Sequence, residues 1–501
     1  MDSLKSIVKT MNSQEIKDFR KFIHSQKKLD KRKDLELFDL LVSNTDHQNI
    51  ELTLYGKPNK VPYHALRKRL TRKLVDFIVL KRLGEDTSTS SSLMGIISLS
   101  KYFFERRADE LAWTYLKSAE AKALLSEQFD LLNTIYLLQI DHWNADFADD
   151  IHSIIEKRSE NKRLLDEDER ATIACSLIRK ELQQTVLNSK EVDFEGITKL
   201  ILSSYNLTNA LIKRPKILYN ILSITRSTIL AKKDFYSFEP YLIQQYNNAK
   251  EQFGFSKNTH FYKLHLVYMI SHVLYRNRKF DAAESYLKEM AEDLYAYNKS
   301  HIMLFYGRYT LLLAAVSCYQ GKLQEAIDLL EVAGEEDSRL FSPKDKVKIQ
   351  LNLSIYYFMA EQYDKAIKKG SSFNFSEKWF EKNIGKEWVF KKQIMEVIMQ
   401  VELDNHEIAI NKIRSLERVS SSLFNHPLYS RAKTFLELIK KMISDPLNFK
   451  NEATQEKINK YLVVVPEEKE DLQAMTFYSW LKAKVQKRKY YEVLLETIKP
   501  D

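Results

Sequence analysis

Apolar residues recur along most of the chain at helical spacing, three and four positions apart. The clearest example is KFDAAESYL, residues 279–287, which is followed by KLQEAIDLL and QYDKAIKKG. Alanine holds the same place in all three, as Ala283, Ala326 and Ala366, and a fourth marker follows at Ala409. These markers are 43, 40 and 43 residues apart. Because repeats of this length are typical of stacked helical hairpins, the pattern predicts an α-helical solenoid.

Each of the first three alanine markers has another small residue twelve positions before it: Ser271, Ala314 or Ser354. Apolar residues also lie three positions before and four positions after the marker, as with Phe280 and Leu287, which gives one helical stripe. Two helices that cross closely need small side chains at their contact. The spacing therefore predicts that each alanine of a second helix faces a small residue of the first helix.

The beginning of the chain lies outside this repeat. Apolar spacing predicts three helices there, within residues 12–26, 33–44 and 63–83. GEDTSTSSS, residues 84–92, is small and polar and is typical of a flexible linker. The predicted organisation is a basic three-helix domain (1–83), a linker (84–92) and a repeat array (93–501) of about nine or ten hairpins, each about 40–45 residues long.

Composition supports long helices. The chain of 501 residues has only 10 glycines and 9 prolines, whereas sheets and α/β crossovers need many turn residues. Two cysteines, Cys175 and Cys318, lie in apolar helical runs and are expected to be reduced core residues. The N-terminus lacks an apolar signal segment, and we find no run of about 18 apolar residues. We therefore expect an all-α, cytoplasmic protein with no membrane span.

The spacing between residues 264 and 373 resembles the tetratricopeptide-repeat family. That family has a small residue in the first helix, an aromatic residue or leucine near the end of that helix, and alanine in the second helix. The matching sets are Ser271, Leu274, Phe280 and Ala283; Ala314, Gly321, Leu323 and Ala326; and Ser354, Tyr357, Tyr363 and Ala366. The period here exceeds the usual 34 residues, so HEAT-type repeats remain the alternative.

The resemblance implies a binding groove lined by the first helix of each hairpin. The groove positions carry over to His265, Tyr268, His272, Tyr275, Arg276, Arg308, Tyr319, Lys348 and Phe358. Tyrosine and arginine are enriched at binding hot spots, and a basic aromatic groove suits an acidic or C-terminal peptide. The alternative is that this second stripe of each first helix packs against the neighbouring hairpin.

Positive charge is concentrated at the start of the chain. Residues 1–82 hold 19 Lys and Arg against 10 Asp and Glu, while the whole chain carries a net charge of +10. The predicted third helix includes a dense basic cluster: Arg67, Lys68, Arg69, Arg72 and Lys73. These side chains could contact phosphates of a nucleic acid or an acidic partner protein. The alternative is an ordinary solvated face beside an apolar stripe.

We find no sequence motif for catalysis or cofactor binding. The chain has no HExxH, CxxC, GxSxG or phosphate-binding glycine loop. His142, Asp146 and Asp149 would share one face of a continuous helix and could bind a divalent ion, but the interpretation we favour is a solvated polar face of a surface helix. The predicted function is a non-catalytic scaffold, with no cofactor and no metal, that binds a protein or peptide partner. A nucleic-acid-binding regulator is the alternative, and partner identity and oligomeric state stay open.

Overall fold

All the regular secondary structure is helical in the residues that the computed structural model of the chain describes. These residues are 3–11, 13–26, 32–43, 47–56, 60–85, 89–144, 146–187, 194–207, 213–232, 236, 238–252, 254–299, 301–335, 340–371, 377–419, 427–446, 456 and 472–498. Within them the chain forms 24 α-helices, one short 3-10 helix at Tyr297–Lys299 and no strand. The predicted all-α fold class is confirmed.

The chain divides into two compact units, Met1–Asp166 and Glu167–Asp501, and not at the predicted linker. Helix α5 (Lys60–Glu85) continues through Gly84, and helix α6 (Thr89–Glu105) begins within the segment predicted to be flexible. Residues 86–88 of that segment lie outside the described residues. Short hydroxyl side chains are well tolerated in the first turn of a helix, and the buried Leu93 follows directly, so residues 89–92 are helical although composition indicated a linker.

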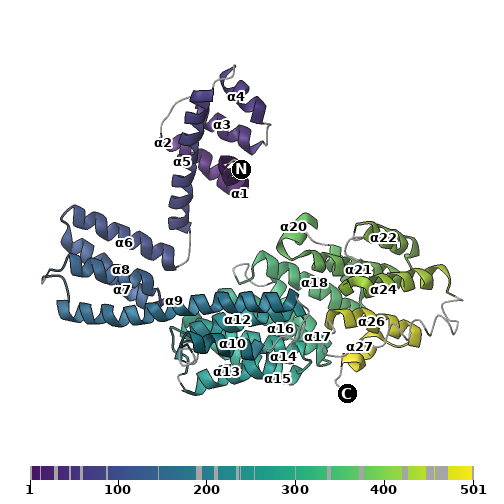
Figure 1. Ribbon diagram of the computed structural model, residues 1–501. Coiled ribbons are helices and arrows are strands. Elements are labelled where there is room, and N and C mark those ends of the chain that lie inside the picture. The colour runs from purple at the N-terminus through teal and green to yellow at the C-terminus, as the bar shows by residue number, and fades with distance from the viewer. Residues whose placement is uncertain are drawn as a thin grey trace. The chain divides into compact units, whose positions relative to one another are not determined.

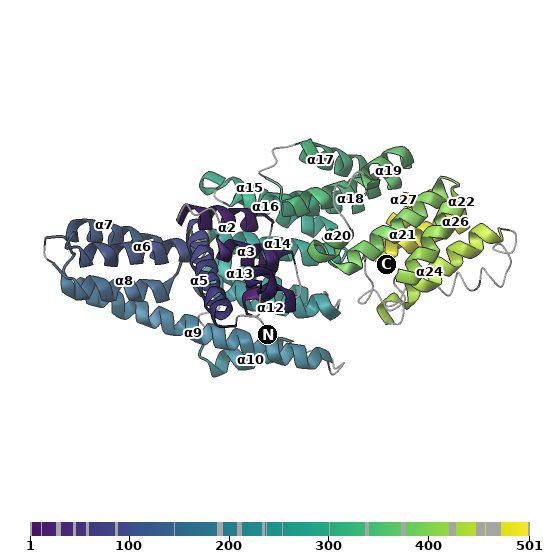
Figure 2. The same ribbon diagram turned by 90° about the horizontal axis from the view of Figure 1, so that it is seen from above.

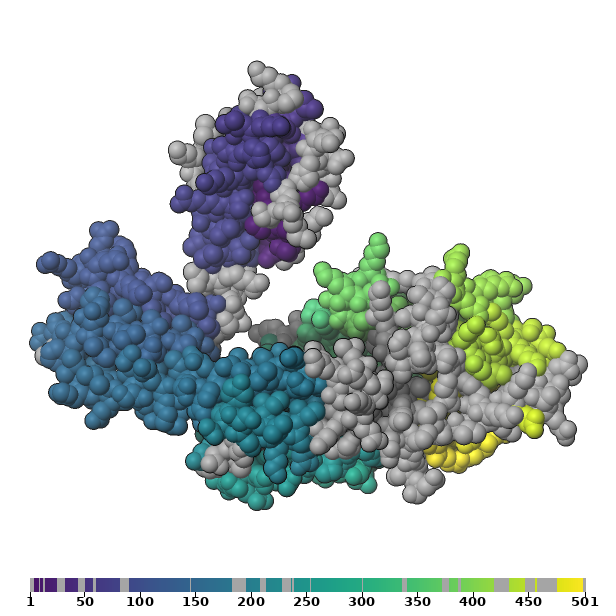
Figure 3. Space-filling view, viewed as in Figure 1, coloured from purple at the N-terminus to yellow at the C-terminus, as the bar shows by residue number. Residues whose placement is uncertain are grey.

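In the described residues, the N-terminal helices number five rather than the predicted three. They are α1 (Ser3–Thr10), α2 (Ser13–Gln26), α3 (Lys33–Val42), α4 (His47–Tyr55) and α5. Their side chains share one apolar core, which contains Phe19, Phe38 and Phe77, and the space-filling view shows them packed as one body (Figure 3). The two additional helices, α1 and α4, each bury an apolar pair four residues apart, so both pairs belong to the same core.

The rest of the first unit is a second group of helices. After α6 come α7 (Asp109–Leu125), α8 (Phe129–Asp141) and the start of α9 (Ile151–Leu187), which continues into the second unit. Helix α7 packs against both α6 and α8. Its alanines Ala112, Ala119 and Ala123 are completely buried, which allows the close approach of its neighbours.

The second unit consists of successive helices joined mostly by short connections (Figure 1, Figure 2). They are α10 (Phe194–Ser204), α12 (Pro215–Lys232), α13 (Phe238–Gln252), α14 (His260–Arg276), α15 (Phe280–Tyr295), α16 (Ile302–Tyr319), α17 (Leu323–Glu335), α18 (Pro343–Met359), α19 (Tyr363–Ser371), α20 (Glu377–Asn383), α21 (Lys386–Glu402), α22 (His406–Val419), α24 (Pro427–Ser444), α26 (Leu472–Gln486) and α27 (Tyr490–Ile498). The closest packing is between consecutive helices: α14 with α15, α16 with α17, α18 with α19, α21 with α22, and α26 with α27.

The alanine markers lie at the contacts within these pairs. Ala283, Ala326, Ala366 and Ala409 are all completely buried. In the pair α18–α19, the Ser354 hydroxyl donates a hydrogen bond to the carbonyl oxygen of Ala366 at 2.7 Å. The contact predicted from the twelve-residue spacing is therefore confirmed for this pair. A larger residue at either place would separate the two helices and expose their shared apolar stripe.

The turns inside the pairs share one backbone geometry. One residue after each first helix takes a left-handed conformation, as at Arg278, Gly321, Glu361 and Asp404, where φ is 60°, 88°, 59° and 58°. The next N–H then donates to a carbonyl five residues back, as from Lys279 to Leu274 at 2.9 Å. This is the usual way to satisfy the last carbonyls of a helix. Glycine supplies this conformation at only one of the four turns, so the low glycine content does not limit the number of tight turns.

The last helix pair packs back onto helices much earlier in the chain. The Tyr491 hydroxyl on α27 donates to the carbonyl oxygen of Cys318 on α16 at 2.6 Å. Tyr490 lies edge-on to Phe358 of α18, with ring centroids 5.7 Å apart. On α26, the Trp480 indole N–H donates to Glu402 of α21. These contacts bring the end of the chain beside the middle helices.

Helix α16 is long and apolar enough, by length and composition, to cross a membrane, the one such helix in the described part of the chain. From the sequence we expected no segment of this kind. Its apolar side chains are used in packing, since Phe305, Leu312 and Val316 are buried in the core of the second unit. Its last turns include Cys318, which is a free buried thiol, as is Cys175 of α9. Both cysteines are thus core residues, as predicted.

Candidate partner-binding site

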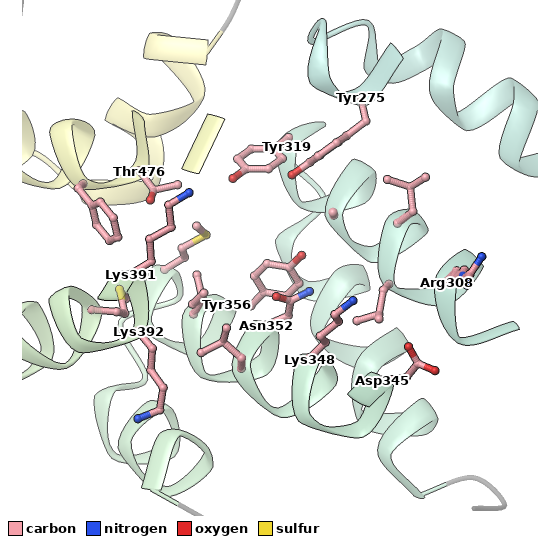
Figure 4. A pocket seen from close by; sticks show the side chains of 18 of the residues that line it. Tyr275, Arg308, Tyr319, Asp345, Lys348, Asn352, Tyr356, Lys391, Lys392 and Thr476 are labelled. Atoms are coloured by element: carbon pink, nitrogen blue, oxygen red, sulfur yellow. The ribbon is translucent and has the colours of Figure 1, made fainter. Parts of the chain in front are cut away.

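A cavity of about 290 Å³ lies within the second unit; we call it the central cavity. Five helices line it: α14, α16, α18, α21 and α26. The lining residues are Tyr268, Tyr275, Arg308, Leu311, Leu312, Ala315, Tyr319, Asp345, Lys348, Leu351, Asn352, Ile355, Tyr356, Met359, Lys391, Lys392, Met395, Thr476 and Phe477. Each of the five helices is the first helix of its pair, so the first helices converge on one hollow (Figure 4).

Tyrosines form much of the polar wall of the central cavity. Tyr275 and Tyr319 lie side by side, with ring centroids 5.9 Å apart, and Tyr356 comes from the neighbouring helix α18 (Figure 4). Phe280 stacks on Tyr319 from behind at 5.6 Å. Burial raises the pKa of both Tyr319 and Tyr356 well above the usual value. These phenols are therefore neutral donors and acceptors at physiological pH.

The cavity also carries an excess of positive charge. Arg308, Lys348, Lys391 and Lys392 line it, against one carboxylate, Asp345. Lys392 pairs with Glu396, one helical turn further along α21. The Asp345 carboxylate caps α18 and accepts hydrogen bonds from the Ser342 N–H at 3.1 Å and from the Ser342 hydroxyl at 2.6 Å.

Arg308 and Lys348 are exposed, and within the described residues neither has a carboxylate at ion-pair distance. Asp345 is nearby but is held by its own helix cap. Two positive charges beside a single carboxylate leave an excess of positive charge, which attracts anions into a hollow with low-dielectric walls. The cavity can thus hold a group that is both negative and partly apolar.

The structure brings together five of the nine residues predicted to line a groove: Tyr268, Tyr275, Arg308, Tyr319 and Lys348. Tyr268 and Tyr275 are two turns apart on α14 and present the same face of that helix to the cavity. The other four predicted residues, His265, His272, Arg276 and Phe358, are not among the lining residues.

Two of those four are packing residues. His265 contacts the rings of Tyr219, Phe261 and Phe305, each with centroids 4.6 Å away. Phe358 is only 2% exposed and packs in the core beside the ring of Tyr490. The prediction that they face a groove is wrong, because helices on both sides cover these positions. For them the alternative interpretation, packing against a neighbouring helix, is correct.

The other two predicted residues, His272 and Arg276, also do not line the cavity. His272 has the rings of Tyr268 and Tyr275 on either side, with centroids 6.2 and 6.3 Å away. Burial lowers its pKa well below the usual value, and the charges of Arg226, Arg276 and Lys348 lower it further. The imidazole is therefore neutral at physiological pH and supports the two tyrosines that line the cavity.

Fourteen of the nineteen lining residues were not predicted, among them the polar residues Tyr356, Lys391 and Thr476. Tyr356 could have been found, since it follows Lys348 by eight positions and so lies close to the same face of α18. Thr476 could not, because it comes from α26, and only the folding of the last helix pair against the middle helices brings it there.

The basic cluster of the N-terminal helices is divided between structural and exposed positions. Lys73 pairs with the buried Asp34 at 2.7 Å, and Arg32 joins the same carboxylate at 3.1 Å. Arg67 lies over the ring of Tyr63 and is partly buried. Three of the five predicted residues, Lys68, Arg69 and Arg72, are exposed on α5.

The carboxylate of Asp34 is held strongly by its two cationic neighbours. Burial alone would raise its pKa, but hydrogen bonds from Arg32 and Lys73 outweigh burial and lower the pKa to about 2. Lys73 therefore serves the core of the N-terminal helices. A phosphate contact there would compete with this ion pair.

The residues considered as a metal site do not share a helix. Helix α8 ends at Asp141, and His142 stacks on Phe104 with ring centroids 4.0 Å apart. Asp149 lies in the connection before α9 and pairs with Lys117 and Lys157. In the described part of the chain, no three His, Cys, Asp or Glu side chains are grouped so that they could hold a metal ion.

No family model matches the chain, and no curated protein sequence matches it. The resemblance to tetratricopeptide repeats rests on the residues of the chain alone and stays a prediction.

Proposed function

We propose that the second unit is a non-catalytic binding module that takes an acidic peptide segment of a partner protein into the central cavity. The observation that carries this proposal is the composition of the cavity wall, where tyrosines lie beside Arg308 and Lys348, which have no ion-pair partner among the described residues. Tyrosine offers large, rigid contact area with a polar end, and arginine and lysine attract carboxylates. A peptide that combines acidic and apolar side chains complements both.

The helix pairs give this site its proposed rigidity. In the proposed arrangement they form a tetratricopeptide-like array whose first helices line the binding face. Since the lining side chains stand on helices packed on both sides, few of them lose freedom when a ligand binds. Recognition would then resemble other grooves in which preordered helices hold an extended or helical peptide.

A binding role fits the titration behaviour of the cavity better than acid–base catalysis does. General acids and bases work best with pKa values near the operating pH. Burial moves the pKa values of Tyr319 and Tyr356 away from neutrality, and the Asp345 carboxylate is occupied in a helix cap.

The proposal predicts that the charge of Lys348 matters and that of Lys346 does not. Both side chains are exposed on α18, but only Lys348 lines the cavity. A displayed library of random peptides with free C-termini is selected on the wild-type protein, and affinities of the selected peptides are measured by fluorescence anisotropy. Lys348→Glu should weaken binding about tenfold, because it reverses a charge that attracts the peptide. Lys346→Glu changes net charge equally and should leave affinity unchanged.

Two results would contradict the proposal. If selection yields no acidic consensus, the chemistry assigned to the cavity is wrong. Equal losses in the Lys348→Glu and Lys346→Glu variants would mean that the peptides respond to the overall charge of the protein rather than to the cavity.

Nucleic-acid binding by the N-terminal helices is the second candidate function. The observation in its favour is the exposure of Lys68, Arg69 and Arg72 on one 26-residue helix. If this function is right, binding of labelled duplex DNA should weaken steeply with salt. The triple change of these residues to glutamine should reduce the slope of log K against log salt by about 2 to 3. Changing Lys17 and Lys21, exposed on α2, to glutamine is the control; equal slopes in both variants would reject a site on α5.

A further inference from the structure

One arginine of the second unit is partly buried and has no counter-charge among the described residues. Arg226 lies on α12, and its Nε is buried with no hydrogen-bond partner among the described residues. Burial lowers the pKa of its guanidinium; Tyr268 raises it, and the like charge of Arg308 lowers it further. Placing two guanidinium groups near each other in a partly desolvated site costs free energy. Such an arrangement is typical of an anion-binding site.

The same group of positive charges lowers the pKa values of two histidines. The pKa of His265 falls to about 4, first because of burial and then because of Arg308 and Arg226. His272 is lowered by burial and by Arg226, Arg276 and Lys348. The positive charges of side chains on α12, α14, α16 and α18 thus act on these two neutral imidazoles.

No carboxylate of the described residues lies within ion-pair distance of Arg226, Arg308 or Lys348. Asp345 is the carboxylate whose charge reaches this region, since it acts on Tyr268, but it caps α18. Arg214, just before α12, shows what a structural arginine looks like in the same unit. It is 8% exposed and pairs with Asp168 at 2.5 Å and with Glu167 at 3.3 Å.

We propose that Arg226, Arg308 and Lys348 form a binding site for a phosphomonoester beside the central cavity, which Arg308 and Lys348 line. A planar guanidinium matches phosphate oxygens in a two-pronged hydrogen bond, and a dianion balances several positive charges better than a single carboxylate does. The phosphate can come from a phosphorylated side chain of the bound peptide or from a free organic phosphate. The inference rests on the proposed function, because Arg308 and Lys348 belong to both sites.

The test begins with inorganic phosphate and phenyl phosphate as probes on the full-length protein. Affinity is measured by calorimetry and the melting temperature by differential scanning fluorimetry, with sodium chloride at matched ionic strength. Arg226→Met keeps an apolar stem of similar length but removes the charge. It should weaken phosphate binding about tenfold to a hundredfold. It should also raise the melting temperature of the unliganded protein, because the uncompensated buried charge is gone.

Two further variants keep the test decisive if Arg226→Met fails to fold. Arg308→Gln changes an exposed side chain and should weaken phosphate binding without lowering the melting temperature. Arg214→Met removes a paired arginine, so it should lower the melting temperature and leave phosphate affinity unchanged. If wild-type protein shows no phosphate binding beyond sodium chloride, or if Arg226→Met lowers the melting temperature and still binds phosphate, the inference is overturned.

A last comparison distinguishes the two sources of phosphate and tests the two proposals separately. Peptides selected on the protein are synthesised with glutamate or with phosphoserine at each acidic position. A tenfold or larger gain from one phosphoserine, lost in Arg226→Met, assigns the site to a phosphorylated peptide. Binding of phenyl phosphate with no selected peptide assigns it to a free organic phosphate and rejects the proposed function. If acidic peptides bind but phosphate does not bind, the inference is rejected and the proposed function still holds.

Discussion

Replacing Asp34 by alanine is expected to destabilise the N-terminal helices by about 3–5 kcal/mol, because it leaves a buried cationic pair without its counter-charge. Asp34 is 3% exposed and holds Arg32 of the α3 cap and Lys73 of α5 together. Removal of one partner from a buried ion pair costs far more than the pair contributes relative to apolar residues. The measurement is hydrogen exchange of the α3 and α5 amides in the full-length protein.

The matched control is Asp39→Ala on the same helix. Asp39 pairs with Arg20, but both side chains are more than 40% exposed. Exposed pairs contribute about 0–1 kcal/mol, so exchange in α3 should change little. If the α3 and α5 amides exchange equally fast in the two variants, the Asp34 ion pair does not stabilise these helices more than the exposed Asp39 pair does.

The same carboxylate makes the stability of these helices depend on pH. The pKa of Asp34 is about 2 in the folded chain, against about 3.9 for an unfolded aspartate. Its contribution is fully present above about pH 4 and is lost as the pH falls toward 2. Asp34→Ala should remove this part of the acid sensitivity.

Sequence patterns predicted the helix pairs well because the contact within a pair is local. Two small residues twelve positions apart face each other across one tight turn, and the Ser354–Ala366 hydrogen bond reports that contact. Composition was a poorer guide to the linker. The run of serines after Thr89 favours flexibility when read alone, yet Leu93 anchors a helix that includes it.

The candidate site was predictable as far as single helices define it. Tyr268 and Tyr275 share a face of α14, and helical spacing is enough to place them together. Spacing cannot tell which of two stripes another helix covers. His265 was placed in the groove, but rings from α12 and α16 enclose it, and Phe358 was placed there although α27 packs on it. Both errors come from contacts between residues far apart in the sequence.

Replacing Trp480 by alanine is expected to cause the second largest loss of stability, because Trp480 anchors the last helix pair. Its side chain is 1% exposed, packs against Phe435 with ring centroids 6.1 Å apart, and donates to Glu402. Trp480→Ala should cost about 3–5 kcal/mol by leaving a large cavity. Since α26 supplies Thr476 and Phe477 to the central cavity, the variant should also weaken peptide binding.

Hydrogen exchange of the α26 and α27 amides, followed alongside peptide affinity, separates loss of the wall from general unfolding. Lys484→Met is the control, because it removes an ion pair with the same Glu402 from a side chain that is 40% exposed. That change should cost at most about 1 kcal/mol and leave affinity intact. Faster exchange confined to α26 and α27 with weaker binding means that this pair is part of the binding site. Faster exchange with tighter binding means instead that the pair occupies the place of a ligand, and the wall assigned to Thr476 and Phe477 is then wrong.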